Sequence, residues 1–382
     1  MEQRNARYPM PEDDKVGPSN APPGEPPPLN PDRSLKTVMP SSPLALNTTM
    51  LPTLAALEKA AGQVNAVLPP TPHIRWPLLC QQLGIEVWVK HENHTPVGSF
   101  KIRGGLVYLY DLKRSQPRVD GVVCATRGNH GQSVAFSARR LGLVPHVVVP
   151  ECNSPEKNAA MRALGAALIV HGSDLAEAAA HAKALAAERG LWPVPSFDPL
   201  LVAGVGTYSL EFLRARPDLD VVYVPIGLGS GICGMIAARE ALGHKAAIVG
   251  VVSAEAPAYA RSFAAGTVVP CPARTGICDG LAVPNPHPDA LDLIRRHVDR
   301  IVEVTDEEVM NAMRALFFQT HNVAEGAGAA GYAAVVRERD RLIGKTVGIV
   351  ICGGNVDTHV FARVLAAAPL DPASAPDLGY RL

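Results

Sequence analysis

Residues 221–243 read VVYVPIGLGSGICGMIAAREALG, and this stretch decides the fold class of the chain. It joins a nearly continuous apolar run to a Gly-rich turn and then to an Ala-containing stretch of helical length. A run that is apolar at successive positions is typical of a strand buried on both faces of a parallel sheet. The stretch therefore predicts a strand, a turn and a helix, with the turn at the carboxyl end of the strand.

The same unit recurs along the chain. Strand-like runs occupy residues 121–126, 144–150, 166–172, 246–255 and 346–354, and stretches of helical length occupy residues 132–142, 156–165, 174–190 and 306–319. Several helical stretches end at Gly165, Gly190 or Gly243, as a C-terminal cap would. This alternation predicts an α/β fold in which helices cover both faces of parallel sheets and ligands bind at the carboxyl ends of the strands.

Composition narrows the class of protein. The 382 residues include 36 Lys+Arg and 36 Asp+Glu, and 47% are hydrophobic. The zero net charge argues against a nucleic acid or an anionic membrane as the main partner, and the apolar content argues against a disordered chain. Residues 1–44 differ, because 11 of the 35 prolines lie within residues 1–43. We expect a disordered tail there, either a solvated extension or an arm that grips a partner subunit.

Cysteine usage and hydropathy indicate the compartment. The seven cysteines are scattered without a C-x-x-C pair, so the sequence favours neither a disulfide framework nor a zinc ribbon. No run of about 18 apolar residues occurs, and the N-terminus has no apolar segment of the kind found in signal peptides. We expect a soluble protein in a reducing cytoplasm.

Three Gly-rich segments follow predicted strands, at residues 125–132, 227–234 and 352–355. Exposed N–H groups at a strand's carboxyl end bind anions, and GLGSGICG leads directly into a helix N-terminus that would favour a phosphate. The same segment also satisfies G-x-G-x-x-G, and an acidic residue ends the next strand. A dinucleotide fold, as in a nicotinamide-dependent dehydrogenase, and a plain tight turn therefore stay open; the residues concerned are Gly229, Gly231, Gly234 and Glu255.

One lysine stands out. Lys101 lies in HENHTPVGSFKIRGG, directly before the predicted helix GGLVYLYDLKR. A lysine at a helix start experiences positive dipole potential, which disfavours its protonated form and makes it a better amine nucleophile. A solvated lysine without such a role is the alternative.

At this point the motifs resemble a known family. SFKIRGG, GNHGQ, the Gly-rich loop after a strand, EGAGA and CGGNVD are similar, in this order, to those of the fold type II pyridoxal phosphate enzymes, in particular the serine/threonine dehydratase and serine racemase group. The resemblance covers roughly residues 70–360. It disfavours the dinucleotide fold. It implies two three-layer α/β domains of the tryptophan synthase β-like architecture, a large one (45–111 plus 199–382) and a small mobile one (112–198), with the cofactor between them in a homodimer.

The resemblance also implies the roles of single residues. Lys101 would be the Schiff-base lysine with Phe100 beside the ring, and Asn129 would bind the phenolic oxygen of pyridoxal 5'-phosphate. Cys352 would face the pyridine nitrogen, and Glu325 would lie near the cofactor. The phosphate would be held by Gly227, Leu228, Gly229, Ser230 and Gly231. The substrate carboxylate would be bound by Thr126, Gly128, Asn129 and His130, Arg127 would belong to the same substrate-binding loop, and Gly204 would lie at a turn on the pocket edge.

The implied activity is β-elimination from a hydroxy amino acid such as threonine or serine. The amine of Lys101 would remove the α-proton, the β-hydroxyl would leave, and hydrolysis would give a 2-oxo acid and ammonia. The thiol of Cys352 would protonate the pyridine nitrogen weakly, since its reference pKa is about 8.5 and burial raises it. This favours prompt elimination over transamination. Because the chain ends soon after CGGNVDTHVFARVL, we expect a catabolic enzyme without a regulatory domain.

Two departures bear on substrate and metal. Arg127 stands where serine racemases carry a serine base, and a guanidinium cannot act as that base. It could bind the second carboxylate of 3-hydroxyaspartate or form an internal ion pair. At the family's divalent-metal position the chain has Glu255, Tyr259 and Arg261, and the Arg261 cation would oppose a metal. We expect no divalent ion there, and Arg261 could pair with Glu255 instead.

The roles of two histidines and the choice among competing functions stay open. For His91 and His94, surface or supporting roles are favoured over catalysis. The competing functions are a racemase or a β-substituting synthase of the same superfamily, a nicotinamide-dependent dehydrogenase, and a non-catalytic binding protein on the same scaffold.

Overall fold

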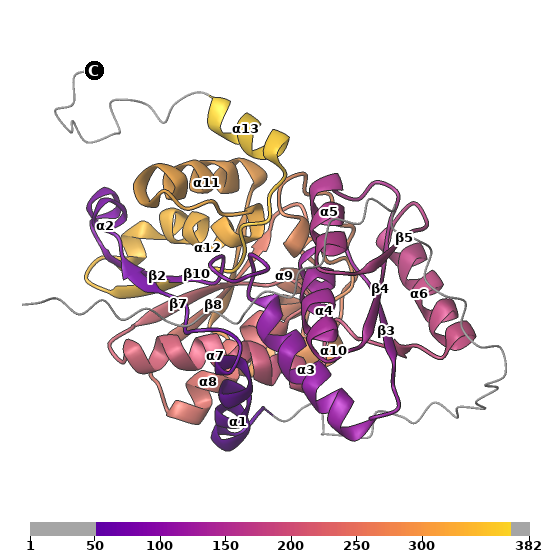
Figure 1. Ribbon diagram of the computed structural model, residues 1–382. Helices are drawn as coiled ribbons and strands as arrows, with labels where there is room; N and C mark the ends of the chain where they lie inside the picture. The colour runs from indigo at the N-terminus through magenta and orange to yellow at the C-terminus, as the bar shows by residue number, and fades with distance from the viewer. Residues whose placement is uncertain (1–50, 368–382) are drawn as a thin grey trace, which may run out of the picture. The chain divides into compact units, whose positions relative to one another are not determined.

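The computed structural model describes residues 51–367, so the predicted Pro-rich tail at residues 1–44 lies outside the described part. Strands and helices alternate through most of it (Figure 1). The larger sheet has the order β1-β2-β10-β7-β8-β9, and the smaller has the order β5-β4-β3-β6. The strands of the larger sheet are β1 (His73–Arg75), β2 (Glu86–His91), β7 (Val221–Pro225), β8 (Ala247–Ser253), β9 (Arg300–Val304) and β10 (Thr346–Ile351). Those of the smaller sheet are β3 (Gly121–Ala125), β4 (Val144–Val149), β5 (Ala167–Val170) and β6 (Trp192–Pro193).

Pairing in both sheets is parallel, except that β1 runs antiparallel to β2 at the edge of the larger sheet. All five residues of β7 are buried, as the apolar run predicts for a strand covered on both faces. The predicted α/β fold with parallel sheets is therefore confirmed. The smaller sheet falls within residues 121–193, but the division into two domains and the mobility of the smaller one stay predictions.

Helices cover both faces of the larger sheet (Figure 1). On one side lie α7 (Pro199–Ala215) and α8 (Ser230–Leu242), and on the other lie α11 (Asp306–Thr320) and α12 (Gly326–Arg337). The smaller sheet is contacted by α4 (Asn129–Arg140) and α6 (Leu175–Arg189), and α3 (Lys101–Ser115) packs against both α4 and α7. The remaining helices are α1 (Leu54–Asn65), α2 (Pro77–Leu83), α5 (Pro155–Ala163), α9 (Ala258–Ala265), α10 (Pro288–His297) and α13 (Thr358–Ala366), with 3-10 turns η1 (Asp279–Leu281) and η2 (Arg339–Leu342).

The helix ends follow the glycine signals. Gly165, Gly190 and Gly243 have φ of 85°, 64° and 61°, so each takes the left-handed conformation at or just past a helix end. The sequence pattern misses β1, β2, β6 and β9. Two of these are very short, while charged residues interrupt EVWVKH in β2 and RIVEV in β9.

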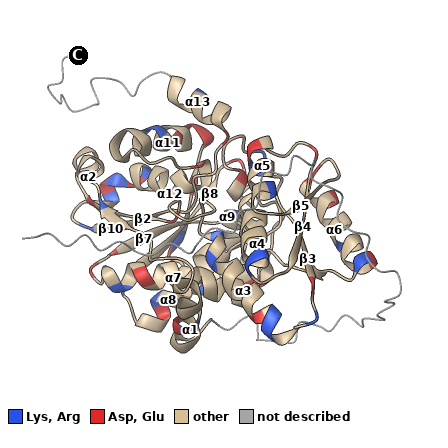
Figure 2. Ribbon diagram, viewed as in Figure 1, with Lys and Arg blue, Asp and Glu red and all other residues tan. Residues whose placement is uncertain are grey.

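Charge and hydropathy agree with the composition. Basic and acidic residues are interspersed along the helices seen in Figure 2 rather than gathered by sign. Between residues 51 and 367, no helix has the length and apolar character needed to cross a bilayer.

Candidate active site

The predicted lysine begins a helix and meets the predicted phosphate loop. Lys101 is the first residue of α3, and its Nζ donates to the Ser230 hydroxyl at 3.1 Å and lies 5.0 Å from the ring centroid of Phe100. Burial lowers the pKa of Lys101 to about 8, although Cys352 and Glu325 act in the opposite direction. Desolvation is therefore the largest cause of the lowered pKa. An amine with this pKa is substantially unprotonated in mildly alkaline solution and can act as a nucleophile.

The loop at residues 227–231 has the form of an anion cradle between β7 and α8. In the described chain, none of its N–H groups donates to a backbone carbonyl. Gly229 has φ of 114°, and a Cβ there would lie 2.6 Å from the Cβ of Ala290, so the turn requires glycine. Tyr259 OH donates to the Leu228 carbonyl at 2.7 Å and holds the loop from outside. Free N–H groups at a helix start are suited to a phosphate.

Asn129, the first residue of α4, lies on the other side of the site. Its Nδ2 donates to Glu325 Oε1 at 2.7 Å, and its Oδ1 accepts from Asn355 Nδ2 at 2.8 Å. An amide nitrogen has two hydrogens, so one donor stays available for a ligand oxygen. This is compatible with the predicted bond to a phenolic oxygen.

The end of β10 is tied to the segment that precedes Lys101. The Cys352 carbonyl accepts from the Phe100 N–H at 3.0 Å, and Ser99 and Gly353 form an antiparallel bridge. Burial raises the pKa of Cys352 well above its ordinary value, and Glu325 adds to the effect. The Cys352 thiol is therefore neutral near pH 7, as its predicted place opposite a pyridine nitrogen requires.

Glu325 contributes a buried carboxyl group with a free oxygen. The residue is 2% exposed, and among the described residues its Oε2 has no hydrogen-bond partner. Its N–H donates to the Gly353 carbonyl at 3.1 Å, which fixes it beside the end of β10. Burial raises the pKa of Glu325 to about 7, against the opposing effects of Lys157 and Asn129. An unpaired buried oxygen of this kind indicates a bound group that would complete its bonding.

The predicted carboxylate-binding loop lies between β3 and α4. The Gly128 N–H donates to the Thr126 hydroxyl at 3.0 Å, and burial lowers the pKa of His130 to about 3, so its ring is neutral. Arg127 is exposed and forms no ion pair within residues 51–367. Among the described residues Arg127 therefore has no internal ionic partner, and both alternatives for its role stay predictions.

Gly204 was predicted to lie at a turn, but it lies in the middle of α7. A Cβ at this position would lie 2.5 Å from the Arg103 carbonyl and 2.8 Å from the Cα of Gly104. Gly204 is therefore needed where α7 crosses the backbone of α3. The turn implied by the family resemblance is therefore wrong for Gly204, because its missing side chain serves helix packing.

His91 and His94, which precede Lys101 in the sequence, both form side-chain contacts. His91 is buried and accepts from Trp76 Nε1 at 3.0 Å, and its ring stacks on that of His94 at 5.0 Å. His94 Nε2 lies 2.6 Å from Asn322 Oδ1. These contacts tie the end of β2 and the residues after it to Trp76 and Asn322, and the supporting role of both histidines stays a prediction.

The residues at the family's divalent-metal positions form other contacts in this chain. Glu255 Oε2 accepts from the Ser253 hydroxyl at 2.9 Å, and Tyr259 is committed to Leu228. Arg261 is exposed and forms no pair with Glu255 in the described chain, so the predicted replacement of a metal by an Arg261–Glu255 pair is wrong. The prediction that no divalent ion binds here stays a prediction.

Sequence reasoning missed several residues that complete the site. Asn355 lies in the CGGNVD motif, so a motif signal existed for it, whereas Asp279 lies outside the motifs that carry the family resemblance. Ser133 Oγ donates to the Lys101 carbonyl at 2.6 Å, and Lys157 pairs with Asp279. Nothing in the local pattern around Ser133 or Lys157 distinguishes them from ordinary helix residues.

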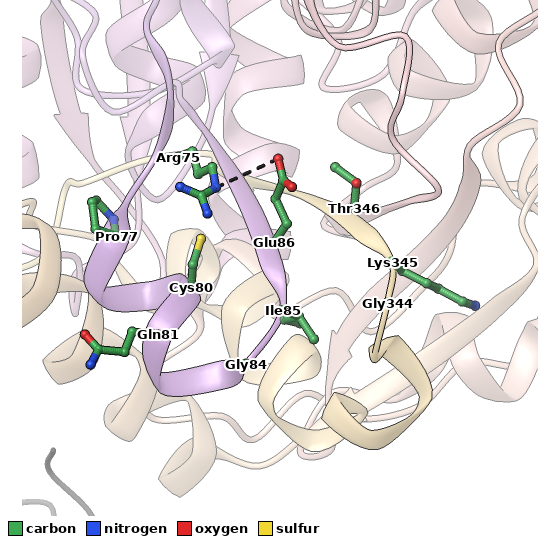
Figure 3. A pocket seen from close by; sticks show the side chains of 10 residues that line it. All are labelled: Arg75, Pro77, Cys80, Gln81, Gly84, Ile85, Glu86, Gly344, Lys345 and Thr346. Carbon is green, nitrogen blue, oxygen red and sulfur yellow. Dashed lines mark ion pairs between the residues drawn. The ribbon is translucent and has the colours of Figure 1, made fainter.

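A surface cavity of about 530 Å³ lies elsewhere, at the amino ends of β2 and β10 (Figure 3). Arg75 and Glu86 face each other across it at 3.9 Å, while Lys345 is directed away from that pair. No predicted site residue lines this cavity. Because ligands of open α/β sheets bind at the carboxyl ends of strands, this cavity is not the expected site.

The arrangement of a lysine, an anion cradle and a neutral thiol at the carboxyl ends of parallel strands agrees with a family match. A family model described as "Pyridoxal-phosphate dependent enzyme" matches residues 64–353, and the chain belongs to this family. It is therefore a pyridoxal-phosphate dependent enzyme, and both the predicted cofactor and the predicted family resemblance are confirmed. The family match rules against the nicotinamide-dependent dehydrogenase.

Several proteins of known name are similar to this chain in sequence or structure. The L-threonine ammonia-lyase of Geobacter sulfurreducens is 40% identical over 290 residues, which cover 75% of this chain and 71% of that protein. The L-threo-3-hydroxyaspartate ammonia-lyase of Saccharomyces cerevisiae is 30% identical over 318 residues, or 83% of this chain and 97% of that protein. The solved structure of the processed form of threonine deaminase isoform 2 from Solanum lycopersicum has a TM-score of 0.76 and 26% identity. That match covers 84% of this chain and 96% of the other.

The residues fit the cofactor that the family implies. The free N–H groups at residues 227–231 would hold its phosphate, Lys101 would hold its aldehyde carbon, and Asn129 retains a donor for its phenolic oxygen. When bound, pyridoxal phosphate withdraws electrons from the α-carbon of an attached amino acid. The Lys101 amine is then the base available to take the α-proton.

Glu325 makes the stability of the cofactor-free protein depend on pH. A carboxyl whose folded pKa of about 7 exceeds its ordinary value of 4.5 stabilises the fold most below pH 4.5, and this contribution is lost as pH rises to about 7. We expect wild-type apoprotein to lose up to about 3 kcal/mol more unfolding free energy than Glu325→Gln over this window. Urea unfolding at pH 5 and 8 measures the difference. Exposed Glu307→Gln is the control, and parallel pH dependences for wild type and Glu325→Gln would contradict the assignment.

Proposed function

We propose that this chain is an ammonia-lyase that eliminates water from a β-hydroxy amino acid such as threonine or serine and releases a 2-oxo acid and ammonia. The observation that supports the proposal is the Lys101 amine, which donates to Ser230 of the phosphate loop and whose pKa burial lowers to about 8. A 40% identical relative named for threonine supports the substrate class.

Each residue has a defined task in this reaction. The loop at residues 126–130 would bind the substrate carboxylate through N–H and hydroxyl donors at the start of α4. Lys101 would take the α-proton, and a neutral Cys352 would leave the ring nitrogen weakly protonated, which favours loss of the β-hydroxyl. Near pH 8 the amine and its protonated form are both populated, so Lys101 can accept a proton and return it.

A panel of amino acids tests the proposal. Holoenzyme is incubated with L-threonine, L-serine, D-serine and 3-hydroxyaspartate, and both the 2-oxo acid and the ammonia are measured. We expect equal amounts of the two products from at least one hydroxy amino acid. Racemisation without release of a 2-oxo acid would contradict the proposal and support the racemase alternative.

Arg127 favours 3-hydroxyaspartate as a second candidate substrate. It is exposed in the loop proposed to bind the α-carboxylate, and no carboxylate in the described chain neutralises it. We expect Arg127→Ala to lower kcat/KM for 3-hydroxyaspartate at least about tenfold, the effect of losing one charged hydrogen bond, while threonine and serine change less than threefold. Equal effects on all three substrates would contradict a role in binding the second carboxylate.

We also propose a cytoplasmic homodimer whose smaller domain, residues 112–198, moves relative to the larger one. Sedimentation equilibrium of the full chain tests the dimer, and a mass equal to that of one chain would contradict it. These features rest on the family likeness.

A further inference from the structure

The first turn of α5 forms an unusual set of contacts with two distant segments. Ser154, the N-cap of α5, donates to Asp357, and Glu156 accepts from both the N–H and the hydroxyl of Thr358, at 2.9 and 3.1 Å. Lys157 forms an ion pair with Asp279. The partners lie 122 to 203 positions further along the chain. This turn therefore ties the region of the smaller sheet to segments that flank the larger one.

The contact of Glu156 replaces a missing local cap. Asp357 is the N-cap of α13, but it makes no side-chain bond to the first turn of its own helix. The carboxylate of Glu156 accepts the Thr358 N–H instead, at the helix end where negative charge is favourable. Thus the start of α13 is completed by a residue from α5.

Lys157 connects this turn to the proposed substrate loop. A Cβ at Gly128 would lie 2.6 Å from Lys157 Cδ, so the lysine stem lies directly against the loop backbone. The Lys157 side chain is 10% exposed, and its positive charge is paired with Asp279, whose side chain is 39% exposed. Burial alone would lower the pKa of Lys157, but Asp279 and Glu325 outweigh it and keep the amine charged.

Both partner segments lead into the site. Asp279 begins η1, whose next residue, Gly280, places its carbonyl 2.6 Å from where a Cβ of Gly227 in the phosphate loop would be. Asp357 and Thr358 follow Asn355, which binds Asn129. The first turn of α5 therefore contacts the loop at residues 126–130 through Lys157. It also contacts two segments that continue into the phosphate loop region and to Asn355.

We propose that Ser154, Glu156 and Lys157 form a clasp that holds the loop at residues 126–130 in the arrangement that binds a substrate carboxylate. The three are positioning residues, and the inference rests on the proposed function. Because the clasp shapes the carboxylate pocket without touching the reacting atoms, its loss weakens substrate binding more than it slows the chemical step.

Kinetics of the holoenzyme with its best hydroxy amino acid provide the first test. We expect Lys157→Met to raise KM at least tenfold while kcat stays within threefold, and Asp279→Asn to do the same. The double variant should be no worse than either single one, since both remove the same pair. Lys183→Met, on the exposed face of α6, is the matched control. A KM within twofold of wild type in Lys157→Met, or additive effects in the double variant, would overturn the clasp.

Hydrogen exchange of the holoenzyme gives a readout independent of turnover. In Glu156→Ala, peptides covering residues 126–132 and 357–362 should exchange at least threefold faster than in wild type, while peptides from β7 and β8 stay unchanged. A change confined to α5 would overturn the proposal. If wild type turns over no hydroxy amino acid, the proposed function fails, and exchange still decides whether the clasp holds the loop.

Discussion

Replacing Lys101 by alanine is expected to lower kcat/KM by more than about a thousandfold, because one residue both holds the cofactor and moves the α-proton. Its Nζ meets Ser230 of the phosphate loop, and its pKa of about 8 keeps an unprotonated amine available. Borohydride treatment of wild-type holoenzyme should fix a pyridoxyl group on the peptide containing Lys101. Mass spectrometry of the digest identifies that peptide.

Two further variants distinguish the need for a neutral amine at residue 101 from the need for a positive charge there. Lys101→Arg keeps a positive charge but provides no neutral amine near pH 8, so it should be as inactive as Lys101→Ala. Lys59→Ala removes an exposed lysine on α1 and should retain full activity. A pyridoxyl group found on another lysine, with Lys101→Ala still active, would remove the basis of the proposed function.

Replacing Arg103 by methionine is expected to cost about 3–5 kcal/mol of unfolding free energy, the usual effect of removing one partner from a buried charge network. Arg103 is fully buried, and its guanidinium donates to both carboxylate oxygens of Glu92, at 2.7 and 3.0 Å. It also donates to both oxygens of Glu211, at 2.7 and 3.0 Å. Lys90 also forms an ion pair with Glu211. The two cations Arg103 and Lys90 therefore balance the two carboxylates.

The methionine variant fills similar space but leaves the buried Glu92 carboxylate and the partly buried Glu211 carboxylate facing one lysine. Urea denaturation of Arg103→Met against wild type measures the loss. Arg114→Met removes an arginine of the same helix that is 64% exposed and paired with Asp111, so it should change the unfolding free energy by less than about 1 kcal/mol. Arg103→Lys should be intermediate, because an ammonium cannot bind two carboxylates bidentately. Equal losses for Arg103→Met and Arg114→Met would contradict the role of the buried network.

This network also bears on the site. Arg103 lies two residues after Lys101, in the first turn of α3. It is held by Glu92, which directly follows β2, and by Glu211 of α7. The start of α3 is therefore fixed from two sides. We expect weaker cofactor retention in Arg103→Lys than in wild type even where the fold survives.

Much of the candidate site could be predicted because its members belong to short motifs. Lys101 within SFKIRGG, Asn129 within GNHGQ, and the loop at residues 227–231 each combine a functional residue with neighbours that fix its backbone. A motif does not determine how its residues pack against distant helices. Gly204 was expected in a turn, but its missing side chain serves the contact between α7 and α3.

The sequence alone determined the alternation of buried strands and helices, the Gly-rich turns and the chemically distinctive lysine, because these depend on residues that are neighbours in the chain. Only the tertiary structure decided that Glu325 is buried with an unpaired oxygen, that Arg127 has no internal partner within the described residues, and that Lys157 pairs with Asp279. Such features depend on pairing and desolvation between residues more than a hundred positions apart, and local periodicity carries no information about them.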